Sequence, residues 1–186
     1  DQRENYVTAS RWAHGRALDA FTSTGGFALH LARVCESVVA VDSSGPALEI
    51  AKSNAQTNGI ANIEFEEADV FSYLSSLEAQ RRRFETVVLD PPAFAKSRNQ
   101  IEAAGRAYKD INLRALRLLE KGGILVTCSC SHHFSEAHLL EAVAEASLDA
   151  RRSLRVLERR SQAIDHPILL TVPETHYLKC LIFEVV

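Results

Sequence analysis

One stretch near the start of the chain, residues 17–27, constrains the fold most strongly. It reads ALDAFTSTGGF, an apolar run with an acid at Asp19, followed by a compact polar loop that holds two glycines. An apolar helical pattern begins at Phe27. Glycines let a ligand approach the backbone closely, and the first turn of a helix offers unpaired N–H groups. The stretch therefore predicts a strand, a ligand-binding loop and a helix, in that order.

Strand and helix patterns alternate along the rest of the chain. After a short helix within residues 1–12, the apolar periodicity predicts strands at 16–21, 37–42, 63–66, 86–89, 124–128, 154–160 and 178–185, and helices at 26–34, 46–58, 68–81, 104–119 and 135–150. Such alternation is typical of an α/β fold, here a Rossmann-like sheet of seven strands, mostly parallel, with helices on both faces. The last two strands have no helix between them, so we expect a hairpin that leaves one strand antiparallel.

Length and composition exclude several classes of protein. The 186 residues suffice for one domain, and no apolar run approaches the roughly 18 residues that span a membrane. Four cysteines do not suggest a disulfide framework, so we expect a reducing, cytoplasmic setting. Cys128-x-Cys130 and His132-His133 lack the partners of a zinc site, so no metal is predicted. The chain starts at Asp1 and contains no Met, which indicates a fragment of a longer protein.

Acidic residues end four of the predicted strands. Asp19 ends the first and Asp42 the second, about 20 residues after the glycine loop, where an acid can bind both hydroxyls of a ribose. Asp69 follows the third strand, where the backbone at Ala68 could reach an adenine, and Asp90 opens Asp-Pro-Pro after the fourth. The carboxyl ends of parallel strands share one edge of a sheet, so these acids are expected to gather there.

The same stretch lacks the signatures of phosphate binding. There is no G-x-G-x-x-G, which argues against a dinucleotide, and no G-x-x-x-x-G-K-[ST], which argues against a nucleoside triphosphate. A ligand with a ribose and an adenine but no phosphate fits better. S-adenosylmethionine is such a ligand.

Several blocks, taken together, resemble a known family. The order LDAFTSTGGF, VVAVDSS, NAQTNG, EADVF, LDPPAF and VTCSCS is similar to class I S-adenosylmethionine-dependent methyltransferases. More narrowly, with DQR, AYKDIN, DHP and PE…YLK, the chain resembles the ribosomal RNA large subunit methyltransferase I family, which makes 5-methylcytosine in large-subunit ribosomal RNA. In that family a PUA-type RNA-binding domain comes first. The resemblance thus implies that residues 1–186 are a methyltransferase catalytic domain.

The resemblance also implies roles for matching positions. Cys130, in its Ser-Cys-Ser context, matches the family's nucleophile, and Asp90 would lie between cofactor and base. Gln2 and Arg3 match a segment near the cofactor. The implied cofactor-binding residues are Gln2, Phe21, Thr22, Ser23, Thr24, Gly25, Gly26, Phe27, Asp42, Ser43, Asp69, Val70 and Asp90.

Cytosine chemistry calls independently for a cysteine. Carbon 5 of cytosine is a poor nucleophile, and a thiolate that adds to carbon 6 increases the electron density on carbon 5. The base must also leave its stack, and Phe94 or Tyr108 could stack on it or simply be ordinary packing. Some 5-methylcytosine enzymes carry a second cysteine where this chain has Ala93. Cys128 could face the same side as Cys130 or be a small buried residue.

Two further functions stay open on the sequence alone. One is methyl transfer to a base nitrogen of guanine or adenine in RNA, which needs no cysteine. The other is a cofactor-binding module that needs another domain for activity. The net charge is −5 over residues 1–95 and +2 over residues 96–186, which weakly favours a small-molecule site beside an RNA face. A homodimer is left open.

Overall fold

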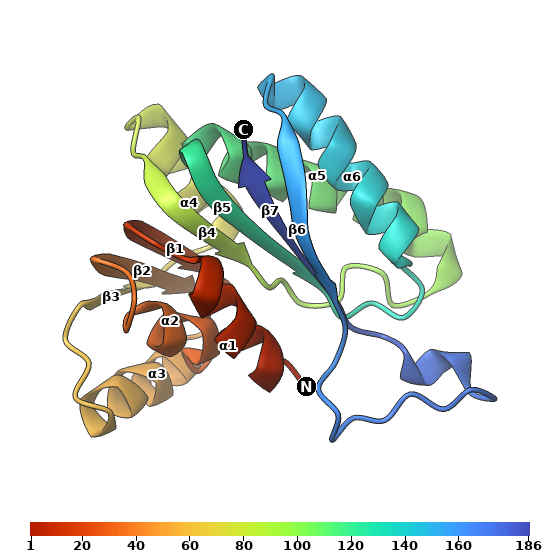
Figure 1. The fold of residues 1–186 in the computed structure, drawn as a ribbon, viewed down its shortest axis with the longest axis horizontal. Coiled ribbons are helices and arrows are strands. Elements are labelled where there is room, and N and C mark those ends of the chain that lie inside the picture. Colours follow the sequence, from red (N-terminus) through yellow and green to blue (C-terminus); the bar gives the residue numbers. More distant parts are fainter.

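The computed structural model describes residues 1–186, and its seven strands form one sheet in the order β3-β2-β1-β4-β5-β7-β6 (Figure 1). The strands are β1 (Arg16–Ala20), β2 (Ser37–Asp42), β3 (Ile63–Glu67), β4 (Phe84–Leu89), β5 (Leu119–Ser129), β6 (Leu154–Arg160) and β7 (Lys179–Val185). β7 is antiparallel to β5 and to β6, and the other pairs are parallel. The predicted mostly parallel sheet with one antiparallel strand is confirmed.

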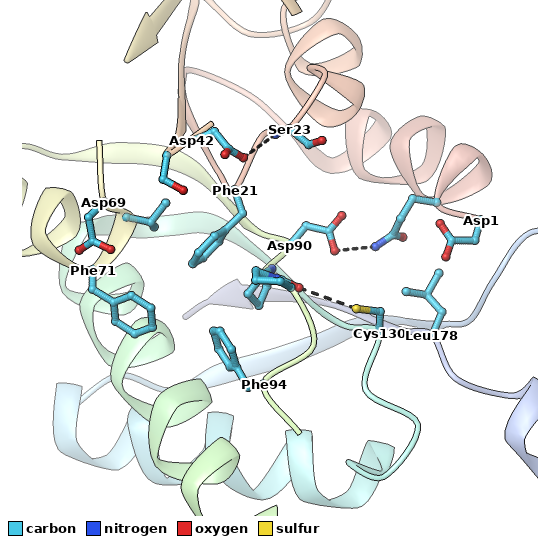
Figure 2. A pocket seen from close by; sticks show the side chains of 15 residues that line it. Asp1, Phe21, Ser23, Asp42, Asp69, Phe71, Asp90, Phe94, Cys130 and Leu178 are labelled. Carbon is cyan, nitrogen blue, oxygen red and sulfur yellow. Dashed lines mark hydrogen bonds between the residues drawn. The ribbon is translucent and has the colours of Figure 1, made fainter. Parts of the chain in front are cut away.

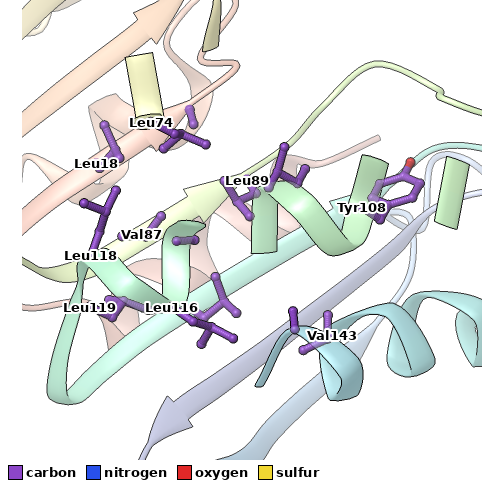
Figure 3. Packing of buried hydrophobic residues seen from close by; sticks show 14 of the residues in the cluster. Leu18, Leu74, Val87, Leu89, Tyr108, Leu116, Leu118, Leu119 and Val143 are labelled. Atoms are coloured by element: carbon purple, nitrogen blue, oxygen red, sulfur yellow. The ribbon is translucent and has the colours of Figure 1, made fainter. Parts of the chain in front are cut away.

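Helices cover both faces of this sheet, as predicted. They are α1 (Arg3–Trp12), α2 (Gly26–Leu31), α3 (Gly45–Thr57), α4 (Val70–Ala79), α5 (Ile101–Leu118) and α6 (Glu136–Ala150), with short 3-10 turns at Arg98–Gln100 and Pro173–Thr175. α1 and α2 pack on one face, and α4, α5 and α6 pack on the other (Figure 1). In Figure 3, Leu116 and Leu118 of α5 lie over Val87 and Leu18 of the sheet.

Three of the helices begin at a side-chain cap. Ser44, Asp69 and Ser135 each accept a hydrogen bond from the backbone N–H three residues later, at the starts of α3, α4 and α6. A side-chain oxygen at this position satisfies one of the free donors of the first helical turn. Of the two serines that precede α3, Ser43 and Ser44, the second is therefore the cap.

The start of one strand differs from the prediction. A strand was expected at 124–128, but β5 already begins at Leu119, directly after α5 ends at Leu118, and Lys121-Gly122-Gly123 lie inside it. Gly122 has φ +79, and a side chain on Gly123 would come 2.9 Å from the backbone oxygen of Glu120. The pairing of β4 with β5 shifts register beside this segment. The glycines therefore permit an irregularity in a strand, which looks like a helix stop when only the sequence is read.

The strand order decides where a site can form. β1 lies inside the sheet, third of the seven strands, with β2 on one side and β4 on the other. The strand order therefore reverses between β1 and β4. Ligands of such sheets bind outside the carboxyl ends of the strands at this switch point. The loops after β1, β2, β4 and β5 all lead to that edge.

Candidate active site

A cavity of about 580 Å³ lies at the carboxyl ends of the parallel strands (Figure 2). Nine of the predicted site residues line it: Gln2, Phe21, Ser23, Asp42, Ser43, Asp69, Val70, Asp90 and Cys130. The remaining lining residues are Asp1, Phe71, Pro91, Pro92, Phe94 and Leu178. The tertiary structure thus brings together side chains from both ends of the chain.

The other predicted site residues support the cavity from behind. Thr22, Thr24, Gly25, Gly26 and Phe27 do not line it. Gly25 has φ +87, a left-handed conformation that favours glycine, and it precedes α2 directly. A side chain on Gly26 would lie 2.4 Å from Cζ of Tyr6 in α1. These glycines shape the turn and let α1 pack against it.

Asp19 anchors the same turn from inside the sheet. It is fully buried, and its Oδ2 accepts hydrogen bonds from Thr22 Oγ1 at 2.6 Å and from the backbone N–H of Ala28 at 2.8 Å. Burial raises its pKa to about 7, while the bond from Thr22 works in the opposite direction. Its Oδ1 has no partner in the protein. A buried acceptor without a partner is costly unless a bound molecule supplies a donor.

Asp42 is held at the tip of β2 by two backbone groups. Its Oδ2 accepts from the N–H of Ser23 at 2.8 Å and its Oδ1 accepts from the N–H of Ser44 at 2.9 Å. Each carboxylate oxygen keeps lone pairs for a further donor. Asp42 is therefore oriented toward the cavity and able to accept two more hydrogen bonds.

Asp69 and a group of aromatic rings line another side of the cavity. Asp69 caps α4, and the N–H of Ser72 donates to its Oδ1 at 2.9 Å, which lowers the pKa of the exposed carboxyl. The ring centroid of Phe71 lies 6.3 Å from that of Phe21 and 6.0 Å from that of Phe94. Figure 2 shows these rings on one side of the cavity. They could cover the flat face of a nucleobase.

Asp90 is bonded to the first residues of the chain. Nε2 of Gln2 donates to Oδ1 of Asp90 at 2.9 Å (Figure 2), and Oε1 of Gln2 accepts from Nδ2 of Asn5 at 2.7 Å. Nε of Arg160 donates to Oδ1 of Asn5 at 3.0 Å. Burial raises the pKa of Asp90 to about 6, and the bond from Gln2 opposes this shift. A polar chain thus links β6 to the acid in the cavity.

Cys130 stands directly after β5 and is partly exposed. Its Sγ lies 4.0 Å from the carbonyl oxygen of Pro91, a contact drawn in Figure 2. Burial, followed by the charge of Asp90, raises its pKa, whereas the charge of Lys179 lowers it. The resting side chain is therefore a thiol at neutral pH, and the ammonium of Lys179 favours its ionisation.

The serines beside Cys130 hold its loop. The hydroxyl of Tyr108 donates to Oγ of Ser129 at 2.9 Å, and the backbone N–H of Ala95 donates to Oγ of Ser131 at 3.3 Å. Tyr108 is fully buried and stacks on Phe134 with ring centroids 4.7 Å apart. Of the two readings of Tyr108, ordinary packing is therefore right. Phe94 lines the cavity, and its role as a stacking ring stays a prediction.

The other cysteines are core residues. Cys35, Cys128 and Cys180 are buried and free. Cys128 of β5 lies opposite Cys180 of β7 in the register of the two antiparallel strands. Burial raises the pKa of Cys128 well above its ordinary value. Its interpretation as a small buried residue is confirmed, and Cys130 alone among the cysteines reaches the cavity.

Sequence reasoning missed three lining residues. Phe71 could have been found, because it follows Asp69-Val70 directly. No sequence pattern pointed to Asp1 or Leu178, since they reach the cavity only when the two ends of the chain come together. The hydroxyl of Tyr177 joins these ends by donating to Oδ2 of Asp1 at 3.0 Å. Arg3, by contrast, does not line the cavity. Its Nη1 forms an exposed ion pair with Oδ2 of Asp165 at 3.3 Å.

Two absences complete the description of the site. No three His, Cys, Asp or Glu side chains come together as metal ligands. None of the helices combines the length and apolar character that a membrane crossing requires.

Comparison with known proteins matches this arrangement. The family model described as "Methyltransferase domain" matches residues 13–169. The chain belongs to the methyltransferase domain family. A ribosomal RNA large subunit methyltransferase I from Shewanella denitrificans is 42% identical over 100% of this chain and 48% of its own length. One from Aeromonas hydrophila is 44% identical over 98% of this chain and 47% of its own length. The resemblance predicted from the motifs is confirmed.

The chain spans about half the length of the curated relatives it matches. Among solved structures, a candidate SAM-dependent methyltransferase from Streptococcus mutans superposes with a TM-score of 0.87 at 17% identity, over 100% of this chain and 49% of that one. NSun6 from Pyrococcus horikoshii, crystallised with SFG, has a TM-score of 0.70 at 16% identity, over 96% of this chain and 51% of that one. At these identities the likeness is one of fold.

Proposed function

We propose that this chain is the catalytic domain of a longer protein that transfers a methyl group from S-adenosylmethionine to carbon 5 of a cytosine in large-subunit ribosomal RNA. One observation carries the proposal. The single cysteine that reaches the cavity, Cys130, shares it with acids placed at the ends of β2 and β3. The names of the relatives support the choice of substrate.

The cavity residues fit this cofactor on charge and shape. Four aspartates and neither a lysine nor an arginine line the cavity, which disfavours a phosphate and favours a cationic nucleoside. Asp42 offers free acceptor capacity for ribose hydroxyls. Asp19, buried behind the glycine turn and with no partner for its Oδ1, adds a further acid close to the cavity. The Phe71 ring and the backbone after Ala68 suit an adenine. When bound, the cofactor supplies an electrophilic methyl group on its sulfonium.

Each predicted residue then has a proposed part in binding. We assign direct contact to the residues that line the cavity, with Asp42 for the ribose and Asp69 with Val70 for the adenine. Thr22, Thr24, Gly25, Gly26 and Phe27 act by holding the turn between β1 and α2 in shape. Gln2 acts through Asp90, to which it is bonded.

Cys130 and Asp90 divide the chemistry between them. The thiolate of Cys130 adds to carbon 6 of the cytosine and forms an S–C6 bond, which makes carbon 5 nucleophilic. Burial raises the pKa of Asp90 to about 6, and in its protonated form the carboxyl can donate a hydrogen bond to nitrogen 3 of the ring as negative charge builds there. Carbon 5 takes the methyl group and S-adenosylhomocysteine is the leaving group. Loss of the carbon-5 proton to a base then breaks the S–C6 bond and restores the thiolate.

Replacement of the proposed nucleophile tests the covalent mechanism. We expect Cys130→Ala to bind the cofactor in isothermal titration as the wild type does, and to lose methyl transfer into ribosomal RNA by about a hundredfold or more. RNA with 5-fluorocytosine should trap a covalent adduct with the wild type, because carbon 5 then has no proton to lose. Cys35→Ala, buried and outside the cavity, is the matched control.

The same measurements separate the other functions. Unchanged transfer in Cys130→Ala, without an adduct, would support methylation of a base nitrogen and refute the covalent route. Cofactor binding without transfer by residues 1–186 would support a binding module that needs a further domain. The cytoplasmic location and a homodimer stay predictions.

A further inference from the structure

Lys179 is a buried cation without a carboxylate partner. It stands at the start of β7, only 3% exposed, and takes part in no ion pair with an acidic side chain. Its Nζ donates to the backbone oxygens of Ser131 at 2.6 Å and Tyr177 at 2.8 Å. Lysines are almost never fully buried unless they are paired. Two neutral carbonyls do not compensate a buried charge, so another partner is expected.

Both carbonyls belong to segments that form the cavity. Ser131 follows Cys130 directly, and Tyr177 precedes the lining residue Leu178. The antiparallel pairing of β5 with β7 places Lys179 opposite Ser129, one residue before Cys130. An ammonium has three N–H donors, of which two are used. The ammonium is thus held against the residue that follows Cys130, and one of its donors is left without a partner in the protein.

We propose that Lys179 is a positioning residue for Cys130, whose buried ammonium holds the Ser131 end of the loop and favours the thiolate over the thiol. This inference rests on the proposed role of Cys130 as nucleophile. This role would account for the burial of a lysine at the start of β7, next to the end of β5.

The charges around the pair agree with this role. Burial lowers the pKa of Lys179 to about 8, while the charges of Cys130 and Glu136 work in the opposite direction. Glu136 is itself bonded to Arg159. Around Cys130, burial and Asp90 raise the pKa and Lys179 lowers it. Below about pH 8 Lys179 carries its charge, so its influence on the thiol is strongest there.

The pH dependence of alkylation tests the proposal without RNA. Iodoacetamide should modify Cys130, because the other three cysteines are buried. We expect Lys179→Met to be alkylated about tenfold more slowly than the wild type at pH 7, the effect of about one pKa unit. The difference should shrink above pH 8, where the wild-type lysine loses its charge. Lys179→Arg should recover part of the rate, and the exposed control Lys121→Met should match the wild type.

Superposable alkylation profiles of wild type and a folded Lys179→Met would overturn the proposal. If that variant does not fold, the alkylation profile of Lys179→Arg decides. An arginine keeps its charge above pH 8, so the alkylation rate of this variant should rise more steeply with pH above 8 than that of the wild type, whose lysine loses its charge there. Parallel profiles of the two proteins above pH 8 would refute the coupling. Retained methyl transfer by Cys130→Ala would instead refute the covalent mechanism, leaving the alkylation result to stand separately.

Discussion

At the scale of single residues, burial disfavours the charged form of two carboxyl groups, Asp90 in the cavity and Asp19 behind it. The pKa of Asp90 is raised to about 6 and that of Asp19 to about 7. A carboxyl group whose pKa is higher in the folded than in the unfolded chain stabilises the fold below its unfolded pKa. That contribution is lost as the pH rises through the folded value. The site is therefore maintained at a cost in stability at neutral pH.

Asp90→Asn should reveal this cost. The amide removes the charge and keeps an acceptor for Gln2, so we expect stabilisation by about 1–3 kcal/mol at pH 7.5. The gain should fade as the pH falls toward 4, where the wild-type carboxyl is protonated in the folded state. Thermal unfolding of both proteins across this pH range measures it. A gain that is equal at pH 4 and pH 7.5 would contradict the assignment, and methyl transfer should fall in the variant.

At the scale of elements, the turn between β1 and α2 depends on the packing of α1. The ring of Tyr6 in α1 covers Gly26 and packs edge-on against Phe27, with centroids 4.7 Å apart. Because Gln2 precedes α1, any displacement of this helix also moves the partner of Asp90. The close packing of α1 against Gly26 thus also affects the position of the Asp90 carboxyl group after β4.

Gly26→Ala should therefore damage both stability and binding. The added methyl group would lie 2.4 Å from Cζ of Tyr6, and we expect a loss of about 1–3 kcal/mol with weaker cofactor binding. Gly105→Ala, inside α5 with its nearest neighbour at 3.8 Å, is the matched control and should stabilise by up to about 1 kcal/mol. Denaturant unfolding and isothermal titration give the two readouts. Equal effects of the two substitutions would refute the packing argument.

At the scale of the whole molecule, the cavity is closed by segments from opposite ends of the chain. Nδ2 of Asn5 donates to the backbone oxygen of Ser161 at 3.1 Å as well as to Gln2, and the backbone N–H of Ala163 donates to the oxygen of Asp1 at 2.9 Å. Asn5 is fully buried. The first turn of α1 and the connection between β6 and β7 are consequently expected to open together.

Asn5→Ala should loosen both segments at once. It leaves Gln2, Arg160 and the Ser161 carbonyl without their partner, so we expect a loss of about 2–4 kcal/mol. Hydrogen exchange should accelerate in residues 1–12 and in residues 161–178 together. Ser10→Ala, which removes only a local hydrogen bond within α1, should change neither. Faster exchange confined to residues 1–12 would show that the two segments are independent.

Local features were readable from the sequence. The alternation of apolar patterns predicted the sheet class and helices beginning near residues 46, 68 and 135. The structure starts these helices at the caps Ser44, Asp69 and Ser135, and capping involves residues only three positions apart. The acids at the strand ends and the Ser-Cys-Ser context of Cys130 indicated a methyltransferase site. Their gathering at one edge followed from the direction of parallel strands, a rule that needs no coordinates.

Only the tertiary structure decided the rest. The burial of Tyr108, the bond from Gln2 to Asp90 and the ammonium of Lys179 behind Cys130 all depend on contacts between residues far apart in the chain. The same holds for Gly122, whose place inside β5 reflects the register with β4. Such contacts arise from strand order and side-chain packing, which no local pattern encodes. The sequence by itself determined the kind of fold and which residues are chemically able to act; the packing decided which of them meet.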